Sequence, residues 1–177
     1  VYEAGALTGA AVLMAASRLI MRFLAAPDYF SAWHYAPVLT LGTALGCLGA
    51  FFASVYMVEK RSAATLVTTA AGAALNLAGN ALLIPVWGAM GAAVSTLASY
   101  AVILAARALH SRRLLKVRIS LPRFLAAMAI LALECFLVER MHTAGSILCC
   151  AAVALLYAGP LLKAMRSGVR ELFPHSP

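Results

Sequence analysis

The chain consists of long apolar segments that short polar connectors separate. We expect membrane-crossing helices over residues 4–25, 35–57, 63–86, 89–109, 122–139 and 144–163. Each segment approaches the ~20 residues that a helix needs to cross a ~30 Å hydrocarbon layer. With 64% hydrophobic and 11% charged residues, the chain is far more apolar than a soluble domain. The sequence therefore predicts an all-α, polytopic transmembrane helix bundle of about six spans.

This pattern divides the chain into four parts. Residues 1–110 hold four transmembrane helices, 111–121 form a basic cytoplasmic connector, 122–163 form a C-terminal transmembrane hairpin, and 164–177 form a basic cytoplasmic tail. The fifth span is the least regular, because Glu134 interrupts it. The first residue is valine, and an apolar run opens almost at once without the basic start of a signal peptide. We therefore expect the chain to begin inside a longer protein.

The basic residues alternate between the connectors. Most of the 14 lysines and arginines lie in residues 60–61, 107–123 and 163–170, whereas the intervening connectors hold only Arg140. Lysine and arginine are retained on the cytoplasmic side of a membrane, so both termini of the segment are predicted to be cytoplasmic. The net charge of +8 does not indicate nucleic-acid binding, because the basic residues lie between apolar runs and not along a polar face.

Arg18 and Arg22 are the charges most suggestive of a site. They lie four residues apart, and therefore on one face of the first span. An arginine within a membrane usually faces a wet cavity or a partner, and its guanidinium matches phosphate oxygens. The pair is a hypothetical substrate-binding site for a diphosphate or an acidic sugar. The alternative is that these side chains simply reach up to the lipid headgroups.

Three further polar side chains interrupt apolar segments. Asn76 and Asn80 are four residues apart, and we favour hydrogen bonds from their amides to neighbouring helices over contact with a ligand. Glu134 has two interpretations, of which the first is proton transfer or cation binding. We favour the second, in which it pairs or reaches water beside Glu139 and Arg140.

Small residues recur at helical spacing in two segments. Gly42, Gly46 and Gly49 share one face of the second span, and Gly72 and Gly79 share a face of the third. Such faces allow helix backbones to approach closely. They are typical both of static packing and of helices that slide in a transporter.

The sequence gives little support to an enzyme. Candidate acid–base groups on the outer side are scattered, with no spacing that brings them together: Asp28, Tyr29, His34, Glu139 and His142. The four cysteines lie in apolar runs without the spacing of metal ligands. A phosphate-binding glycine-rich loop is also lacking. We therefore expect no catalytic residue, no cofactor and no metal.

Two stretches resemble a known family. They are residues 18–33, RLIMRFLAAPDYFSAW, followed by Pro37-Val-Leu, and residues 76–96, NLAGNALLIPVWGAMGAAVST. Together they resemble the later helices of polysaccharide flippases in the multidrug/oligosaccharidyl-lipid/polysaccharide exporter superfamily. In the second stretch we expect Pro85 to end a helix, and Gly88 and Gly91 to permit a short turn. The first stretch has Ala25-Ala26 where the family commonly has a glycine before the tyrosine.

The resemblance implies a fold and a function. The six spans would be the last six of roughly fourteen, with the missing N-terminal helices of the same transporter as partners. The implied function is translocation of lipid-linked oligosaccharide or polysaccharide precursors across a bacterial cytoplasmic membrane by alternating access. A cation-coupled multidrug exporter of the same superfamily is the alternative, and a membrane-bound glycan transferase is a third. Membrane lipids are expected partners, and nucleic acid is not.

Overall fold

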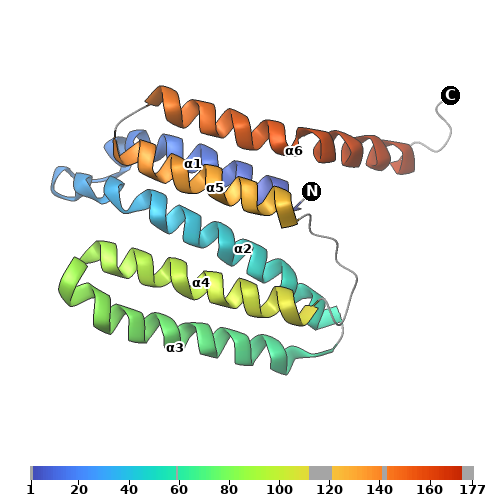
Figure 1. Ribbon diagram of the computed structural model, residues 1–177, viewed down its shortest axis with the longest axis horizontal. Coiled ribbons are helices and arrows are strands. Elements are labelled where there is room, and N and C mark those ends of the chain that lie inside the picture. The colour runs from blue at the N-terminus through green and yellow to red at the C-terminus, as the bar shows by residue number, and fades with distance from the viewer. Residues whose placement is uncertain (1, 59, 112–120, 141–142, 173–177) are drawn as a thin grey trace. The chain divides into compact units, whose positions relative to one another are not determined.

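The computed structural model describes residues 2–58, 60–111, 121–140 and 143–172. All regular elements in these ranges are helices (Figure 1). In chain order they are α1 (Tyr2–Leu24), the 3₁₀ helix η1 (Pro27–His34), α2 (Ala36–Val58), α3 (Ser62–Trp87), α4 (Ala89–Ser111), α5 (Leu121–Glu139) and α6 (Thr143–Leu172). The predicted all-α class is confirmed.

Four of the helices, α1 to α4, are long and apolar enough to cross a membrane. Their length and composition identify a helical membrane protein. The described apolar part of α6, Ala144–Gly159, is shorter than these four. The expected count of six spans therefore stays a prediction.

The helix bounds follow the predicted spans closely, with one exception. Helices α1 to α5 begin and end within two residues of the expected positions. Helix α6 continues to Leu172, past the expected end at residue 163. The predicted basic tail is therefore helical over its first part. Most of the predicted connector, residues 112–120, lies outside the described residues, as do residues 173–177.

The chain forms two compact units. One unit consists of Val1–Ala15 together with Leu121–Pro177, and the other consists of Ala16–Ser120. The second unit contains α2, α3 and α4, and α4 packs against both α2 and α3. These three helices lie side by side in Figure 1, with α4 between its two neighbours.

The glycines predicted to share helix faces lie at these contacts. A Cβ atom added at Gly42 would lie 3.2 Å from the Leu97 backbone, and one at Gly46 would lie 3.0 Å from the Tyr100 ring. On α3, a Cβ at Gly72 would meet the side chain of Ile103. Small residues on α2 and α3 therefore let α4 approach closely, as the sequence predicts.

The turn between α3 and α4 differs from its predicted form. Pro85 lies inside α3 and does not end it, because the helix continues to Trp87. A proline this close to a C-terminus removes a single hydrogen bond and keeps a helical φ angle, so two more residues are accommodated. Gly88 ends the helix instead, with a φ of 56° and its N–H donating to the Ile84 carbonyl at 2.8 Å. A positive φ is a glycine conformation.

Gly91 has a packing role and lies outside the turn. It is part of α4, and a Cβ atom there would lie 2.6 Å from the Leu83 carbonyl carbon. The two helices therefore meet backbone to backbone at this position.

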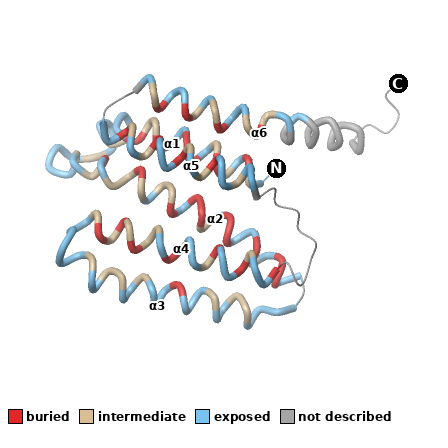
Figure 2. The backbone as a smooth tube through the Cα atoms, viewed as in Figure 1, coloured by how far each residue is buried: buried red, intermediate tan, exposed pale blue. Residues whose placement is uncertain are grey.

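Helix α3 is the least buried of the three helices (Figure 2). Gly72 is its one buried residue, and large apolar side chains such as Leu66, Leu77 and Leu82 are more than 70% exposed. An apolar surface of this size on a membrane helix suits contact with lipid or with another membrane helix.

Candidate functional site

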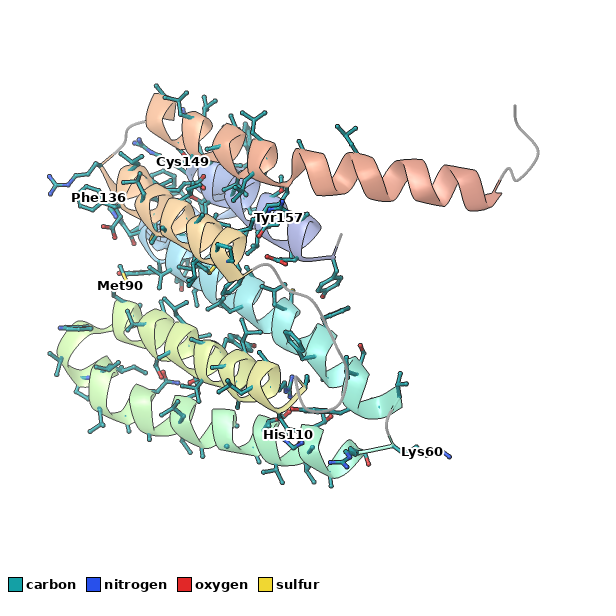
Figure 3. The ribbon with its side chains drawn as sticks, turned by 45° about the vertical axis from the view of Figure 1, so that its right-hand side comes forward. Lys60, Met90, His110, Phe136, Cys149 and Tyr157 are labelled. Carbon is teal, nitrogen blue, oxygen red and sulfur yellow. The ribbon has the colours of Figure 1, made fainter. Side chains whose placement is uncertain are left out.

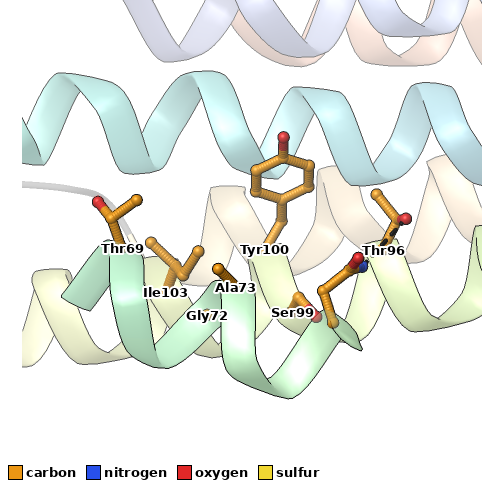
Figure 4. A pocket seen from close by; sticks show the side chains of 8 residues that line it. Thr69, Gly72, Ala73, Thr96, Ser99, Tyr100 and Ile103 are labelled. Atoms are coloured by element: carbon orange, nitrogen blue, oxygen red, sulfur yellow. Dashed lines mark hydrogen bonds between the residues drawn. The ribbon is translucent and has the colours of Figure 1, made fainter. Parts of the chain in front are cut away.

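A cavity of about 380 Å³ lies between α3 and α4 (Figure 4). It is partly open, and residues of these two helices line it: Thr69, Gly72, Ala73, Asn76, Thr96, Ser99, Tyr100 and Ile103. The lining residues recur at three- and four-residue steps, which places them on the facing sides of the two helices. Hydroxyl and amide groups therefore face a cavity inside an otherwise apolar helix pair.

Asn76 is the centre of the hydrogen bonds at one end of the cavity. Its Nδ2 donates to Thr96 Oγ1 at 3.2 Å, which is the predicted bond to a neighbouring helix. Ser95 Oγ donates to the Asn76 carbonyl at 2.9 Å. Asn80 does not bond across, since its Nδ2 donates at 3.1 Å to Asn76 Oδ1 in the same helix. Of the two asparagine side chains, that of Asn76 thus bonds to α4, and the Asn76 backbone carbonyl accepts a second bond from the same helix.

Arg107 lies beyond the other end of the cavity, in the last turns of α4. It is only 7% exposed, and its three nitrogens each donate one hydrogen bond. Nε donates to Thr68 Oγ1 at 3.0 Å, Nη2 to Thr69 Oγ1 at 2.8 Å, and Nη1 to the Gly49 carbonyl at 2.9 Å. One guanidinium therefore connects α4 to both α2 and α3.

The partners of Arg107 are oriented to accept. The Thr68 and Thr69 hydroxyls donate to the carbonyls of Ala64 and Thr65, which leaves their lone pairs for the guanidinium. All three acceptors are uncharged. Among the described residues, Arg107 has no carboxylate partner.

Arg107 lies in the predicted fourth span, 89–109, but it was counted with the basic residues that set the orientation and was not predicted as a site residue. Its charge and its position near a helix end favoured that assignment. The signal that could have found it is periodicity, because Thr96, Ser99, Ile103 and Arg107 recur at helical spacing on one face of α4. Figure 3 shows the labelled His110, one turn later, at the same end of the unit as Lys60.

Arg18 and Arg22 are both exposed. The Arg18 guanidinium lies 5.3 Å from the centre of the Trp33 ring, and Trp33 is buried in η1. This is a cation–π contact. Neither arginine lines the α3–α4 cavity. Substrate contact by these two residues stays a prediction.

Glu134 lies in the other unit and is fully buried. The favoured interpretation was that it pairs or reaches water, and the structure shows pairing, with side chains of α6. Its Oε1 accepts hydrogen bonds from Ser146 Oγ at 3.2 Å and from Cys150 Sγ at 3.3 Å, both on α6. Within the described ranges, Oε2 has no hydrogen-bond partner. Apolar helix packing brings this carboxylate inward, and its neighbours Glu139 and Arg140 stay exposed.

The described residues contain no group of three His, Cys, Asp or Glu side chains that could hold a metal ion. The four cysteines are free thiols. Asp28, Tyr29 and His34 lie in η1, where His34 stacks on Trp33 with ring centres 3.8 Å apart. His142 lies outside the described residues.

No protein-family model, curated protein or solved structure matches the chain. The assignment of a function therefore depends on the geometry of the cavity and on the resemblance of the stretches 18–39 and 76–96.

Proposed function

We propose that the chain is part of a membrane transporter that translocates lipid-linked oligosaccharide or polysaccharide precursors by alternating access across a bacterial cytoplasmic membrane. The observation that supports this most is the group of uncharged amide and hydroxyl side chains within the mainly apolar lining of the α3–α4 cavity. Sugar hydroxyls both donate and accept hydrogen bonds. Amide and hydroxyl side chains, such as those of Asn76, Thr96 and Ser99, suit such a ligand.

The stretch that resembles polysaccharide flippases is also the stretch that forms one end of the cavity. Residues 76–96 comprise the end of α3, the turn at Gly88 and the start of α4. Asn76 and Thr96, at its two ends, line the cavity and bond to each other. The resemblance and the geometry therefore support the proposal at the same residues.

A cation-coupled multidrug exporter is the second candidate. The observation in its favour is Glu134, a buried carboxylate with an oxygen that has no hydrogen-bond partner in the described chain. Embedded carboxylates bind protons or cations in many transporters. The α3–α4 cavity, however, has no carboxylate in its lining, so it offers no charge partner to a cationic drug.

Transport in liposomes tests the proposal. The complete gene product would be reconstituted with a fluorescent lipid-linked oligosaccharide, and a membrane-impermeant quencher would report which leaflet holds the sugar. We expect the label to change leaflets faster than in empty liposomes. Asn76→Leu should slow this exchange, and the control Ser54→Ala should not, because Ser54 is exposed on α2 and donates within its own helix. Ion-driven export of a cationic dye, with no movement of the sugar, would contradict the proposal.

A further inference from the structure

The guanidinium of Arg107 has unused capacity for hydrogen bonds. A guanidinium carries five N–H groups, and the bonds to Gly49, Thr68 and Thr69 use one on each nitrogen. One N–H remains on each Nη atom. These three acceptors are neutral, so they do not balance the positive charge. An arginine among membrane helices usually faces a charged partner or a wet cavity.

Arg107 is next to the α3–α4 cavity. Thr69 lines the cavity and accepts from Nη2 at 2.8 Å. Ile103, which lines the same end, precedes Arg107 by one helical turn. The cavity therefore has hydroxyl and amide groups at intervals along a mainly apolar lining, and a positive charge lies beside one end.

We infer that Arg107 binds a phosphate group of the lipid-linked substrate, and that the cavity holds the sugar attached to that phosphate. The inference rests on the proposed function. A guanidinium fork with two free N–H groups matches two phosphate oxygens. From Thr69 to Asn76 the lining extends about 10 Å along α3, at 1.5 Å per residue. The phosphate lies at the Arg107 end, and the sugar hydroxyls extend toward Asn76 and Thr96.

The same chemistry would be offered by the phosphate of an ordinary anionic lipid. The two sources differ in what fills the cavity, because a phosphatidylglycerol headgroup is smaller than a sugar and lacks its ring. A lipid-linked sugar diphosphate should therefore bind more tightly than phosphatidylglycerol.

The test is binding to the purified chain in detergent. A polyprenyl diphosphate sugar and phosphatidylglycerol are added separately, and thermal unfolding and the dissociation constant are measured. We expect the diphosphate sugar to raise the unfolding temperature of the wild type. Arg107→Met should weaken its binding at least about tenfold, because a charged, bidentate contact is lost. The control Arg61→Gln, an exposed basic residue in the same unit, should bind like the wild type.

Two results would overturn the inference. The first is a wild type whose unfolding temperature neither lipid raises, a result that does not depend on the folding of any variant. The second is a phosphatidylglycerol affinity equal to that of the diphosphate sugar, which assigns the site to bulk lipid. Arg107→Lys keeps the charge and loses the bidentate fork, so it should lose only part of the affinity.

The binding and transport assays separate this inference from the proposed function. Loss of binding in Arg107→Met, together with no transport by the complete protein, would support the phosphate site and reject the transporter. Transport that Arg107→Met leaves unchanged would reject the site and keep the transporter.

Discussion

Arg107 in α4 and Glu134 in α5 are both ionisable side chains buried in helices, but their surroundings differ. Arg107 donates from all three nitrogens to α2 and α3. Glu134 accepts two bonds at Oε1, both from α6, and among the described residues Oε2 has none. The cation is thus held by two neighbouring helices and the anion by one.

The difference has a physical cause in the helix itself. Helical N–H groups are used up by the backbone, whereas each carbonyl keeps a second lone pair and each hydroxyl can accept as well as donate. A buried donor such as Arg107 therefore finds acceptors on any helix, as it does at Gly49. A buried acceptor such as Glu134 depends on the few side chains that donate, here Ser146 and Cys150.

The largest effect is expected from adding a methyl group at a helix contact, and it should differ between the two units. A Cβ atom at Gly91 meets the backbone of α3, 2.6 Å from the Leu83 carbonyl carbon, whereas one at Gly145 meets only the flexible end of Leu137 at 3.1 Å. We expect Gly91→Ala to lower the free energy of unfolding by about 3 kcal/mol, because the backbone must move. Gly145→Ala should cost less than about 1 kcal/mol. Denaturation in mixed micelles measures both, and equal losses would contradict backbone contact between α3 and α4.

The second prediction concerns the shape of the Arg107 side chain. Arg107→Lys keeps the charge but has a single nitrogen, which cannot replace bonds to Gly49, Thr68 and Thr69 together. We expect a loss of about 2 kcal/mol in the free energy of unfolding. Arg107→Met, which also removes the buried charge, should lose less than Arg107→Lys. A larger loss in Arg107→Met than in Arg107→Lys would show that the charge of Arg107 stabilises the fold and that its fork of N–H groups does not.

The third prediction addresses the bond between α3 and α4 at the cavity. Thr96→Val removes the hydroxyl that accepts from Asn76 and keeps the shape of the side chain. The expected loss is about 1 kcal/mol, as for other hydrogen bonds between membrane helices. Thr43→Val is the matched control, because Thr43 is exposed and donates within α2. The same loss of free energy in both variants would show that the bond between Asn76 and Thr96 does not stabilise the contact of α3 with α4.

The smallest effect is expected at Glu134. Glu134→Gln keeps an acceptor for Ser146 and Cys150 and removes a charge that has few partners. We expect the free energy of unfolding to change by less than about 0.5 kcal/mol. Glu139→Gln, at an exposed position on the same helix, provides the baseline. A loss as large as that of Arg107→Lys would show that Glu134 stabilises the fold as much as Arg107 does, and would contradict the comparison.

Much of the fold could be predicted from the sequence, because the length of an apolar run sets the length of a membrane helix. The bounds of the four candidate membrane helices, α1 to α4, follow from this rule. The end of α3 could not be predicted in this way. The sequence does not distinguish a proline that a helix tolerates in its last turn, such as Pro85, from a proline that ends a helix. The glycines at the helix contacts were also recognisable from their spacing.

The candidate site was predictable only in part. Asn76 stood out because an amide in an apolar run needs a partner, and it has one in Thr96. Arg107 did not, because a basic residue near a helix end usually lies in a connector. Its burial depends on Thr68 and Thr69, and threonines are common in membrane helices, where they often bond only to their own backbone. Contacts between helices, and not the local sequence, set its position.

The most direct test of the buried position of Arg107 is hydrogen exchange of its guanidinium group. The chain would be labelled with ¹⁵N-arginine in detergent micelles and transferred to D₂O, and the Nε–H signals would be followed by NMR. We predict that one signal outlasts those of the exposed Arg18 and Arg22, and that this signal is missing in Arg107→Lys. Exchange of every arginine signal at the same rapid rate would contradict the buried position of Arg107.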